Sequence, residues 1–321
     1  MDIKKKQLLS WVFFIPIWIC FLSTFIYYSL HIELPQEPNG VTFFTSDSED
    51  DLKYIICNEL NKATESVFLA SFGITDPHIS KLIESKANEG ITVDILYDKK
   101  QPLSIKKSAP VNFIPFSGRG LMHKKIMAID NEHVFLGSTN LTLFSLAIHK
   151  NMLVSIQSKD LYKAISNDQR FTSDTFNFFP LPLNNAEALE HFVNLIDNAK
   201  TRIYAAIFTF THPKIANALV AAKNRGIDIK VCMDKSMAKG TCLKTVKKLM
   251  SAKIPVTTNI SEGLLHHKCA LIDNDFVFGS ANWTRAAFTK NQEYFLTFEN
   301  LTQVQIQTLE SFFKTLQSSC R

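Results

Sequence analysis

The sequence repeats itself after about residue 40, and this duplication limits what the chain can fold into. Placing each residue over the one 136 positions later aligns Phe68–Phe72 with Tyr204–Phe208 and Asp98 with Asp234. Two copies of one unit are expected to form two similar halves, each able to bury a core against the other. The 321 residues give each copy the length of an ordinary domain.

Each copy alternates apolar strands with amphipathic helices. The predicted elements are helices over 47–63 and 185–199 with an Asp or Asn cap, a helix in each copy ending at Gly90 or Gly226, and strands over 91–97 and 227–233. This alternation predicts an α/β fold in which each half holds a mixed, largely buried sheet flanked by helices. The predicted organisation is 1–40 for an anchor and stalk, 41–176 for the first half and 177–321 for the second, with residues 159–176 joining the halves.

The N-terminal segment predicts a membrane anchor. After Lys4, Lys5 and Lys6, residues 8–30 contain no charged residue, and at about 1.5 Å per residue they can cross the roughly 30 Å core of a bilayer. The alternative is a cleaved signal peptide, but the apolar run is long and Tyr27–Leu30 offers no small-x-small cleavage site. Under either interpretation the remaining chain is extracytoplasmic: membrane-anchored by one helix, or secreted after signal cleavage.

The charge of the chain is concentrated in the second copy. The formal net charge is +5, yet residues 41–176 carry 15 basic and 16 acidic side chains, whereas residues 177–321 carry 17 and 11. Much of the surplus comes from six lysines between Asp234 and Glu262, namely Lys235, Lys239, Lys244, Lys247, Lys248 and Lys253. They form either a solvated helix face or a basic surface that attracts anionic phosphates.

The residues with chemical potential lie at the end of each copy, in the pattern HxKx4D followed by GSxNxT. They are His123, Lys125, Asp130, Ser138 and Asn140 in the first copy, and His266, Lys268, Asp273, Ser280 and Asn282 in the second. Residues two apart in a strand point to the same face about 7 Å apart, so each His and its Lys can converge on one small anion. The aspartates lie an odd number of residues past the histidines, so we expect them to pair or cap at the hairpin that follows.

Two such sets around a shared cleft suit a phosphodiester. The lysines and asparagines can neutralise non-bridging oxygens, while one histidine attacks phosphorus and the other protonates the leaving oxygen. The motif serines are expected beside the asparagines as substrate-binding residues. No metal or cofactor is needed for this chemistry.

The two motifs resemble those of the phospholipase D superfamily, whose signature is HxKx4D with GSxN, present twice per active site. The resemblance covers residues 41–321. It implies two phospholipase D-like units packed with pseudo-two-fold symmetry. It also implies a metal-independent, two-step reaction through a covalent phosphohistidine, with water or an alcohol as second acceptor. The signature includes Asp130 and Asp273, which are therefore counted with the catalytic motif.

Family members act on phospholipids or on nucleic acids, so the motif indicates the reaction more firmly than the substrate. We expect a phosphoric diester hydrolase acting on phospholipid head groups, because a membrane anchor concentrates an enzyme at its lipid substrate. The alternatives are an exported nuclease and a cardiolipin synthase-like phosphatidyltransferase. Both half-sites are in one chain, which predicts a monomer. Trp283 and Phe288 are interpreted either as core residues or as an apolar wall for a lipid.

The family often places an acidic residue a few tens of residues after each histidine, where it hydrogen-bonds the imidazole. The second copy has Glu293 there, while the first has the segment Asn151 to Leu153. A carboxylate favours the imidazolium, so we predict that Glu293 orients His266 as the general acid and that His123 is the nucleophile. The same carboxylate could instead make His266 the stronger nucleophile.

Lys124 and His267 occupy the x position of each HxK motif and should point away from the cleft. A zinc site from His266, His267 and Cys269 lacks a third ligand on the same strand face.

The six cysteines give no disulfide framework in the sequence. Cys232 and Cys269 lie in apolar strands and are interpreted as small core residues, while Cys57, Cys242 and Cys320 are interpreted as exposed thiols.

Overall fold

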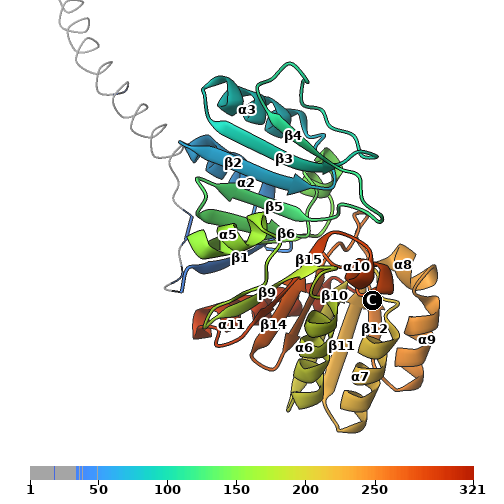
Figure 1. Ribbon diagram of the computed structural model, residues 1–321. Helices are drawn as coiled ribbons and strands as arrows, with labels where there is room; N and C mark the ends of the chain where they lie inside the picture. Colours follow the sequence, from blue (N-terminus) through green and yellow to red (C-terminus); the bar gives the residue numbers. More distant parts are fainter. Residues whose placement is uncertain (1–17, 19–33, 36, 38, 49) are drawn as a thin grey trace, which may run out of the picture. The chain divides into compact units, whose positions relative to one another are not determined.

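Each copy folds into a mixed sheet with helices against it, and the two sheets follow the same strand order (Figure 1). The computed structural model describes Trp18 and residues 34–35, 37, 39–48 and 50–321. The predicted α/β fold built from two similar units is confirmed.

The predicted membrane anchor over residues 8–30 lies, apart from Trp18, outside the described residues. Within the described part of the chain, no helix is both long enough and apolar enough to cross a bilayer. The anchor therefore stays a prediction from the sequence. The fold below is that of residues 36–321, which form one compact unit.

The first sheet has the order β1-β7-β6-β5-β2-β3-β4, in which β2, β3 and β4 are parallel and the other pairs antiparallel. Its elements are β1 (Val41–Thr45), α2 (Leu52–Lys62), β2 (Ser66–Ser71), α3 (Pro77–Asn88), β3 (Thr92–Asp98), β4 (Asn112–Phe116), β5 (Lys125–Ile129), β6 (His133–Gly137), α4 (Leu143–Ala147), β7 (Met152–Gln157) and α5 (Lys159–Ser166). Every residue of β5 is buried, since β5 lies in the middle of the sheet and both of its faces are covered.

The second sheet has the order β8-β9-β15-β14-β13-β10-β11-β12, which repeats the first sheet from β9 onward and adds β8 at one edge. Its elements are β8 (Phe171–Thr172), β9 (Phe176–Leu181), α6 (Asn185–Asn198), β10 (Arg202–Ile207), α7 (Pro213–Asn224), β11 (Asp228–Met233), α8 (Lys235–Lys239), α9 (Leu243–Ser251), β12 (Val256–Thr258), β13 (Lys268–Ile272), β14 (Asp275–Gly279), α10 (Arg285–Thr289), β15 (Glu293–Phe298) and α11 (Gln303–Ser318). The chain passes from the first sheet to the second between residues 157 and 171. Helices α8 and α9 fill the connection that is longer in the second copy.

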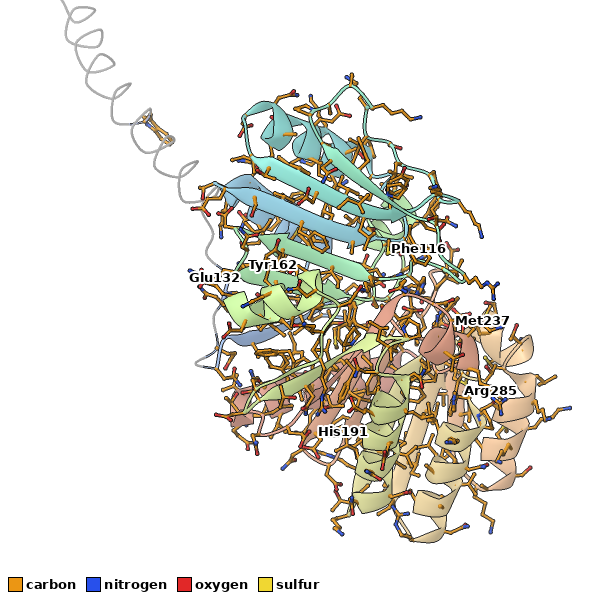
Figure 2. All side chains as sticks on the ribbon, in the orientation of Figure 1. Phe116, Glu132, Tyr162, His191, Met237 and Arg285 are labelled. Atoms are coloured by element: carbon orange, nitrogen blue, oxygen red, sulfur yellow. A yellow bond between two sulfur atoms is a disulfide. The ribbon has the colours of Figure 1, made fainter. Side chains whose placement is uncertain are left out.

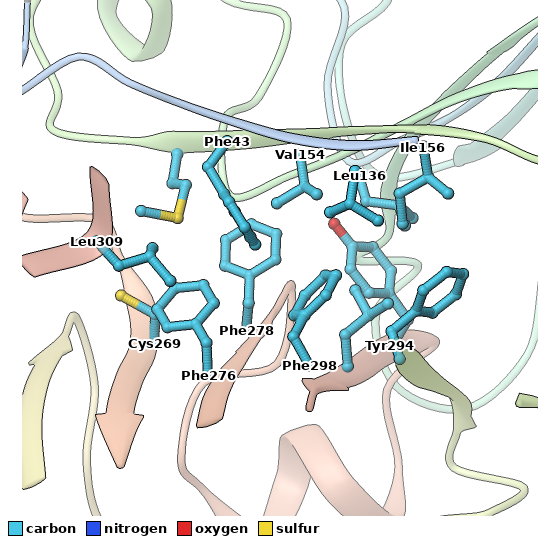
Figure 3. Packing of buried hydrophobic residues seen from close by; sticks show 14 of the residues in the cluster. Phe43, Leu136, Val154, Ile156, Cys269, Phe276, Phe278, Tyr294, Phe298 and Leu309 are labelled. Atoms are coloured by element: carbon cyan, nitrogen blue, oxygen red, sulfur yellow. The ribbon is translucent and has the colours of Figure 1, made fainter. Parts of the chain in front are cut away.

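The two halves share a hydrophobic core. Figure 3 shows Phe43, Leu136 and Val154 of the first sheet facing Phe276 and Phe298 of the second. All five side chains are buried, and burial of one large apolar side chain contributes about 1.5–3 kcal/mol. The shared core therefore fixes one half against the other, which a site assembled from both halves requires.

Two helix ends lie where the sequence predicted them, and one helix start does not. Gly90 and Gly226 follow α3 and α7 with φ of 91° and 94°, a left-handed conformation that glycine adopts without strain. The helix predicted to start at Asp47 starts instead after Asp51, whose side chain accepts from the backbone N–H of Tyr54. Asp47 is engaged elsewhere, in a contact with the second half.

One disulfide contradicts the interpretation of the cysteines. Cys232 of β11 is bonded to Cys320, which follows α11 at the end of the chain. Cys232 was expected to be a core thiol and Cys320 an exposed one, but α11 returns the C-terminus to the edge of the second sheet. Cys57, Cys242 and Cys269 are free, and Cys242 and Cys269 are buried.

Candidate active site

The two HxK motifs lie at corresponding ends of the two sheets, and their side chains are almost completely buried. Lys125 and Lys268 are the first residues of β5 and β13, and each motif histidine lies two residues earlier. The exposed fractions are 8% for His123, 5% for Lys125, 6% for His266 and 1% for Lys268. The small exposed parts of these side chains are the access to the site, and this access is called the opening of the site.

Main-chain hydrogen bonds between the two halves bring the two motifs together. The His123 N–H donates to the Gln292 carbonyl oxygen at 2.8 Å, and the His266 N–H donates to the Lys150 carbonyl oxygen at 2.8 Å. The loop before each histidine therefore lies against the turn that precedes β7 or β15 of the other half. Each histidine is positioned by the half to which it does not belong.

The carboxylate predicted for His266 belongs to His123. Both Oε atoms of Glu293 lie 2.8 Å from His123 Nδ1, and Glu293 is completely buried. The predicted pairing within the second copy is wrong, because the start of β15 lies against the first half's motif loop.

His266 meets neutral acceptors in place of a carboxylate. Its Nδ1 lies 2.9 Å from the Ser138 carbonyl oxygen and 3.2 Å from Asn151 Oδ1. Asn151 is the structural counterpart of Glu293, because each lies 14 residues after the glycine of its own GSxN motif. The sequence comparison had set Leu153 opposite Glu293, two positions too far, so it missed Asn151 as a site residue.

The hydrogen-bond partners of His123 and His266 determine which ring nitrogen carries the hydrogen. Each Nδ1 faces only acceptors, so Nδ1 carries the hydrogen and Nε2 is left for a substrate. Burial lowers the pKa of His123, while the Glu293 carboxylate opposes that change. Burial and the ammonium groups of Lys268 and Lys125 place the pKa of His266 well below 6.5. The two histidines are therefore chemically different.

The two lysines occupy equivalent positions. Lys125 Nζ donates to the His123 carbonyl oxygen and Lys268 Nζ to that of His266, each at 2.7 Å. Burial lowers the pKa of Lys125 to about 7, and burial places that of Lys268 well below 10.5. Two ammonium groups held in a dry site favour a bound anion, which would stabilise their charged forms.

An aromatic ring flanks each His-Lys pair. The Phe72 ring centroid lies 5.1 Å from that of His123 and 5.3 Å from Lys125 Nζ. Phe208 makes the same contacts with His266 and its lysine, at 4.9 and 5.1 Å. The two phenylalanines occupy equivalent positions in the sequence repeat. This equivalence is the signal by which the sequence could have identified them as site residues.

Asp98 and Asp234, which are aligned in the repeat, hold the motif loops. Asp98 Oδ2 accepts from the Met122 N–H at 3.0 Å, and Asp234 Oδ2 accepts from the Leu265 N–H at 3.1 Å. Each acid therefore supports the residue directly before its histidine, a role that the sequence did not indicate.

The motif serines belong to the scaffold. Ser138 Oγ donates to Asn151 Oδ1 at 2.9 Å and accepts from the Met152 N–H, while Ser280 Oγ accepts from the Tyr294 N–H. Both serines are completely buried, so the expected role in binding substrate is corrected to positioning.

The motif asparagines retain open hydrogen-bonding capacity. Asn140 Oδ1 and Asn282 Oδ1 are buried and meet no donor among the described residues. Buried polar groups are normally paired, so these amides are candidates for contact with a bound group.

The motif aspartates directly follow β5 and β13, at the start of the hairpins where a structural role was expected. The Asp130 carboxylate accepts from the N–H groups of Thr64, Glu65 and Ser66. Asp273 accepts in the same way from residues 200–202. Both cap the turn before β2 or β10, so counting them with the catalytic residues is corrected to a structural role.

The x-position residues point away from the site, and one of them, His267, joins the halves. His267 Nε2 lies 2.7 Å from Asp47 Oδ2, and Lys124 forms an ion pair with Asp168. The contact with His267 occupies the Asp47 carboxylate, and α2 is capped by Asp51 instead. Within the described part of the chain, no cluster of three or more His, Cys, Asp or Glu side chains could hold a metal ion.

The chain matches known proteins over both halves. A sequence model of the family described as "Cardiolipin synthase, PLD-like domain" matches residues 56–172 and 192–316. Mitochondrial cardiolipin hydrolase of Xenopus laevis is 32% identical over 129 residues, which cover 39% of this chain and 60% of that protein. Phospholipase D of Rickettsia conorii is 33% identical over 108 residues, covering 33% and 54%. These matches span about three fifths or less of the relatives' own length.

Solved structures with the same fold include phosphatidylserine synthase of Haemophilus influenzae, with a TM-score of 0.72 at 12% identity over 90% of this chain and 88% of that one. NUC of Salmonella typhimurium, a phospholipase D family member, is 31% identical over 46% of this chain and 95% of its own, with a TM-score of 0.41.

Proposed function

Since the chain belongs to the family described as "Cardiolipin synthase, PLD-like domain", we propose that it is a phospholipase D-type phosphodiesterase that hydrolyses phospholipid head-group esters through a phosphohistidine. The observation that carries the proposal is the crossed arrangement of two buried His-Lys pairs, one backed by Glu293 and the other by Asn151. Such a site can attack a phosphodiester from one side and protonate the leaving group on the other.

His123 is the nucleophile in this proposal. Its Nε2 attacks phosphorus, the bond from phosphorus to the leaving oxygen breaks, and the phosphorylated ring becomes positively charged. Glu293, 2.8 Å from Nδ1, stabilises that charge. The nucleophile is the one expected from the sequence, but for the opposite reason, because the carboxylate lies behind His123.

His266 is the general acid. Its Nε2 gives a proton to the leaving oxygen in the first step, and the neutral ring then takes a proton from the water that attacks phosphorus and releases His123. The neutral acceptors on Nδ1 keep the imidazolium a strong acid. The anionic phosphate between two lysines favours the protonated ring before the reaction begins.

The lysines and asparagines stabilise the phosphoryl oxygens. Lys125 and Lys268 supply positive charge, and the side-chain N–H groups of Asn140 and Asn282 can donate to the phosphoryl oxygens. This donor set serves a phosphodiester with no metal ion.

The names of relatives and the predicted anchor favour a lipid substrate. Relatives that match this chain carry the names cardiolipin hydrolase and phospholipase D. The predicted anchor would hold the enzyme at a membrane. The Cys232–Cys320 disulfide is of the kind that persists in oxidising compartments, which agrees with an extracytoplasmic catalytic part.

The test is a substrate panel for the full chain in the presence of chelator. Vesicles of phosphatidylcholine, phosphatidylglycerol and cardiolipin are compared with single-stranded and duplex DNA, and the His123→Ala variant serves as control. We expect head-group release from lipid only. Cleavage of DNA with inert vesicles would replace the proposal by a nuclease, and formation of a new ester with added primary alcohol would replace it by a transferase.

A further inference from the structure

The rim of the active site differs between the two halves. Helix α4 of the first half and the residue that follows it expose Leu143, Phe144 and Ile148, with exposed fractions of 53%, 66% and 47%. The equivalent positions on and after α10, 142 residues later, are Arg285, Ala286 and Lys290, which are exposed as well. The first three residues are called the apolar rim below.

The apolar rim lies at the opening over His266. His149 directly follows Ile148, and its ring centroid lies 6.3 Å from that of His266. The loop that leads to His266 packs on the same turn, since a Cβ added at Gly263 would lie 2.1 Å from the Ile148 carbonyl oxygen. That loop adds one more exposed apolar side chain, Ile260, at 54%.

The opposite rim is basic. The loop before His123 packs on the turn after α10, where a Cβ added at Gly120 would lie 2.2 Å from the Lys290 carbonyl oxygen. This loop carries the exposed Arg119, so Arg119, Arg285 and Lys290 form a basic rim (Arg285 is labelled in Figure 2). Among the described residues none of the three forms an ion pair, so their charge is available to a partner.

Trp283 and Phe288, expected from the sequence as a core or as an apolar wall, belong to the core. Their exposed fractions are 1% and 0%, and both pack in the second half. The exposed apolar surface therefore lies on the other half, at the positions that mirror α10.

We propose that this face of the molecule docks on an anionic bilayer, with the apolar rim inserted among the acyl chains and the basic rim against head-group phosphates. The proposal rests on the proposed lipid substrate and names the surface by which the site reaches it. Large aliphatic and aromatic side chains beside cations are what an interfacial membrane surface requires. A nucleic acid would use the basic rim and leave Leu143 and Ile148 without a function.

The geometry also explains how a buried site can reach a lipid. The histidines are almost completely buried, so a phosphodiester must rise out of the bilayer plane to reach them through the opening. Side chains that enter the bilayer on one side of the opening hold the opening at head-group level.

The first experiment compares two substrates of the full chain reconstituted in vesicles of phosphatidylcholine and phosphatidylglycerol. Leu143→Asp with Phe144→Asp should lower lipid hydrolysis at least tenfold and leave hydrolysis of a soluble nitrophenyl phosphodiester within twofold. Met250→Asp is the matched control, because Met250 is 59% exposed at the end of α9 that precedes β12, away from the opening. Equal losses with both substrates, or no loss in the rim variant, would overturn the proposal.

The second experiment does not depend on activity. Phe144→Trp should show quenching by brominated acyl chains beyond that of the parent protein, and Met250→Trp should not. Quenching at residue 144 without lipid hydrolysis would uphold the docking surface while the proposed substrate fails. Lipid hydrolysis without that quenching would overturn the docking surface alone. The docking surface would also be overturned if the protein bound a short duplex DNA, if Arg285→Glu with Lys290→Glu abolished that binding, and if vesicles did not compete with it.

Discussion

The two halves of the molecule share one strand order and one motif, yet they differ at the two places where function is decided. Behind the motif histidines the first half contributes Asn151 and the second contributes Glu293. At the rim the first half exposes apolar side chains and the second exposes basic ones. The scaffold residues that repeat, such as Asp130 and Asp273, support the fold, whereas the residues that differ have separate tasks in the proposed function.

The largest expected effect separates the two histidines. His123→Ala should lower kcat for lipid by more than about 10⁴-fold, and His266→Ala by about 10²–10⁴-fold. A nitrophenyl ester needs little protonation of its leaving group, so His266→Ala should still release a burst of nitrophenol while His123→Ala should not.

Labelled phosphate in the trapped intermediate of His266→Ala should map to His123. Label on His266 in the His123→Ala variant, with a nitrophenol burst, would reverse the assignment.

The next effect concerns the buried lysines. Lys125→Met should reduce kcat by about 10³-fold and also raise the free energy of unfolding at neutral pH. The pKa of Lys125 is lowered from 10.5 to about 7 in the folded protein. Between pH 7 and pH 10.5 the unfolded chain therefore binds more protons than the folded protein, so the free energy of unfolding rises with pH. At 1.36 kcal/mol per pKa unit the full effect is about 5 kcal/mol. Urea unfolding at pH 7 and pH 9 measures the part of this effect between those values, about 2 kcal/mol, and an unchanged pH dependence in the variant would contradict the cause given.

A smaller effect comes from moving the carboxylate. Glu293→Gln should lower kcat about 10²-fold and shift the acidic limb of the pH–rate profile to lower pH, because the pKa of His123 loses the charge that raises it. Asn151→Asp should shift the alkaline limb to higher pH, because a carboxylate raises the pKa of His266. Profiles of kcat against pH for both variants check the signs, and identical shifts in the two would contradict the difference between the histidines.

The smallest effect tests what the halves have in common. Asp130→Asn and Asp273→Asn should each cost about 1–3 kcal/mol of stability with kcat almost unchanged, because each carboxylate accepts from three backbone N–H groups. Those bonds lower the pKa of both carboxylates, so the wild-type stabilisation is present above the unfolded pKa and is lost as pH falls through the folded pKa. Thermal unfolding at pH 7 and pH 3 measures this, and a large fall in kcat would contradict a purely structural role.

Much of the fold could be predicted because it depends on local sequence patterns. The alternation of strands and helices, the left-handed glycines after α3 and α7, and the convergence of His and Lys two residues apart all follow from neighbouring residues. The structural role expected for Asp130 from its odd spacing agrees with its hydrogen bonds to the backbone N–H groups of residues 64–66.

What could not be predicted depends on contacts between distant segments. The partner of Glu293 was assigned within its own copy, because the spacing says nothing about which half lies against β15. The Cys232–Cys320 disulfide has a sequence separation of 88 residues and needs α11 to return to the sheet edge. The start of α2 moved because Asp47 is taken by His267, again across the halves.

The crossing of the partners has a consequence for how the two histidines could become specialised. Two identical copies that meet about a two-fold axis must place the same group behind both imidazoles, so any change that improves one ring as a nucleophile alters the other ring as an acid. Joining the copies in a single polypeptide removes that restriction. Positions 151 and 293 can then mutate independently, and the Asn and Glu found there record such a division of labour.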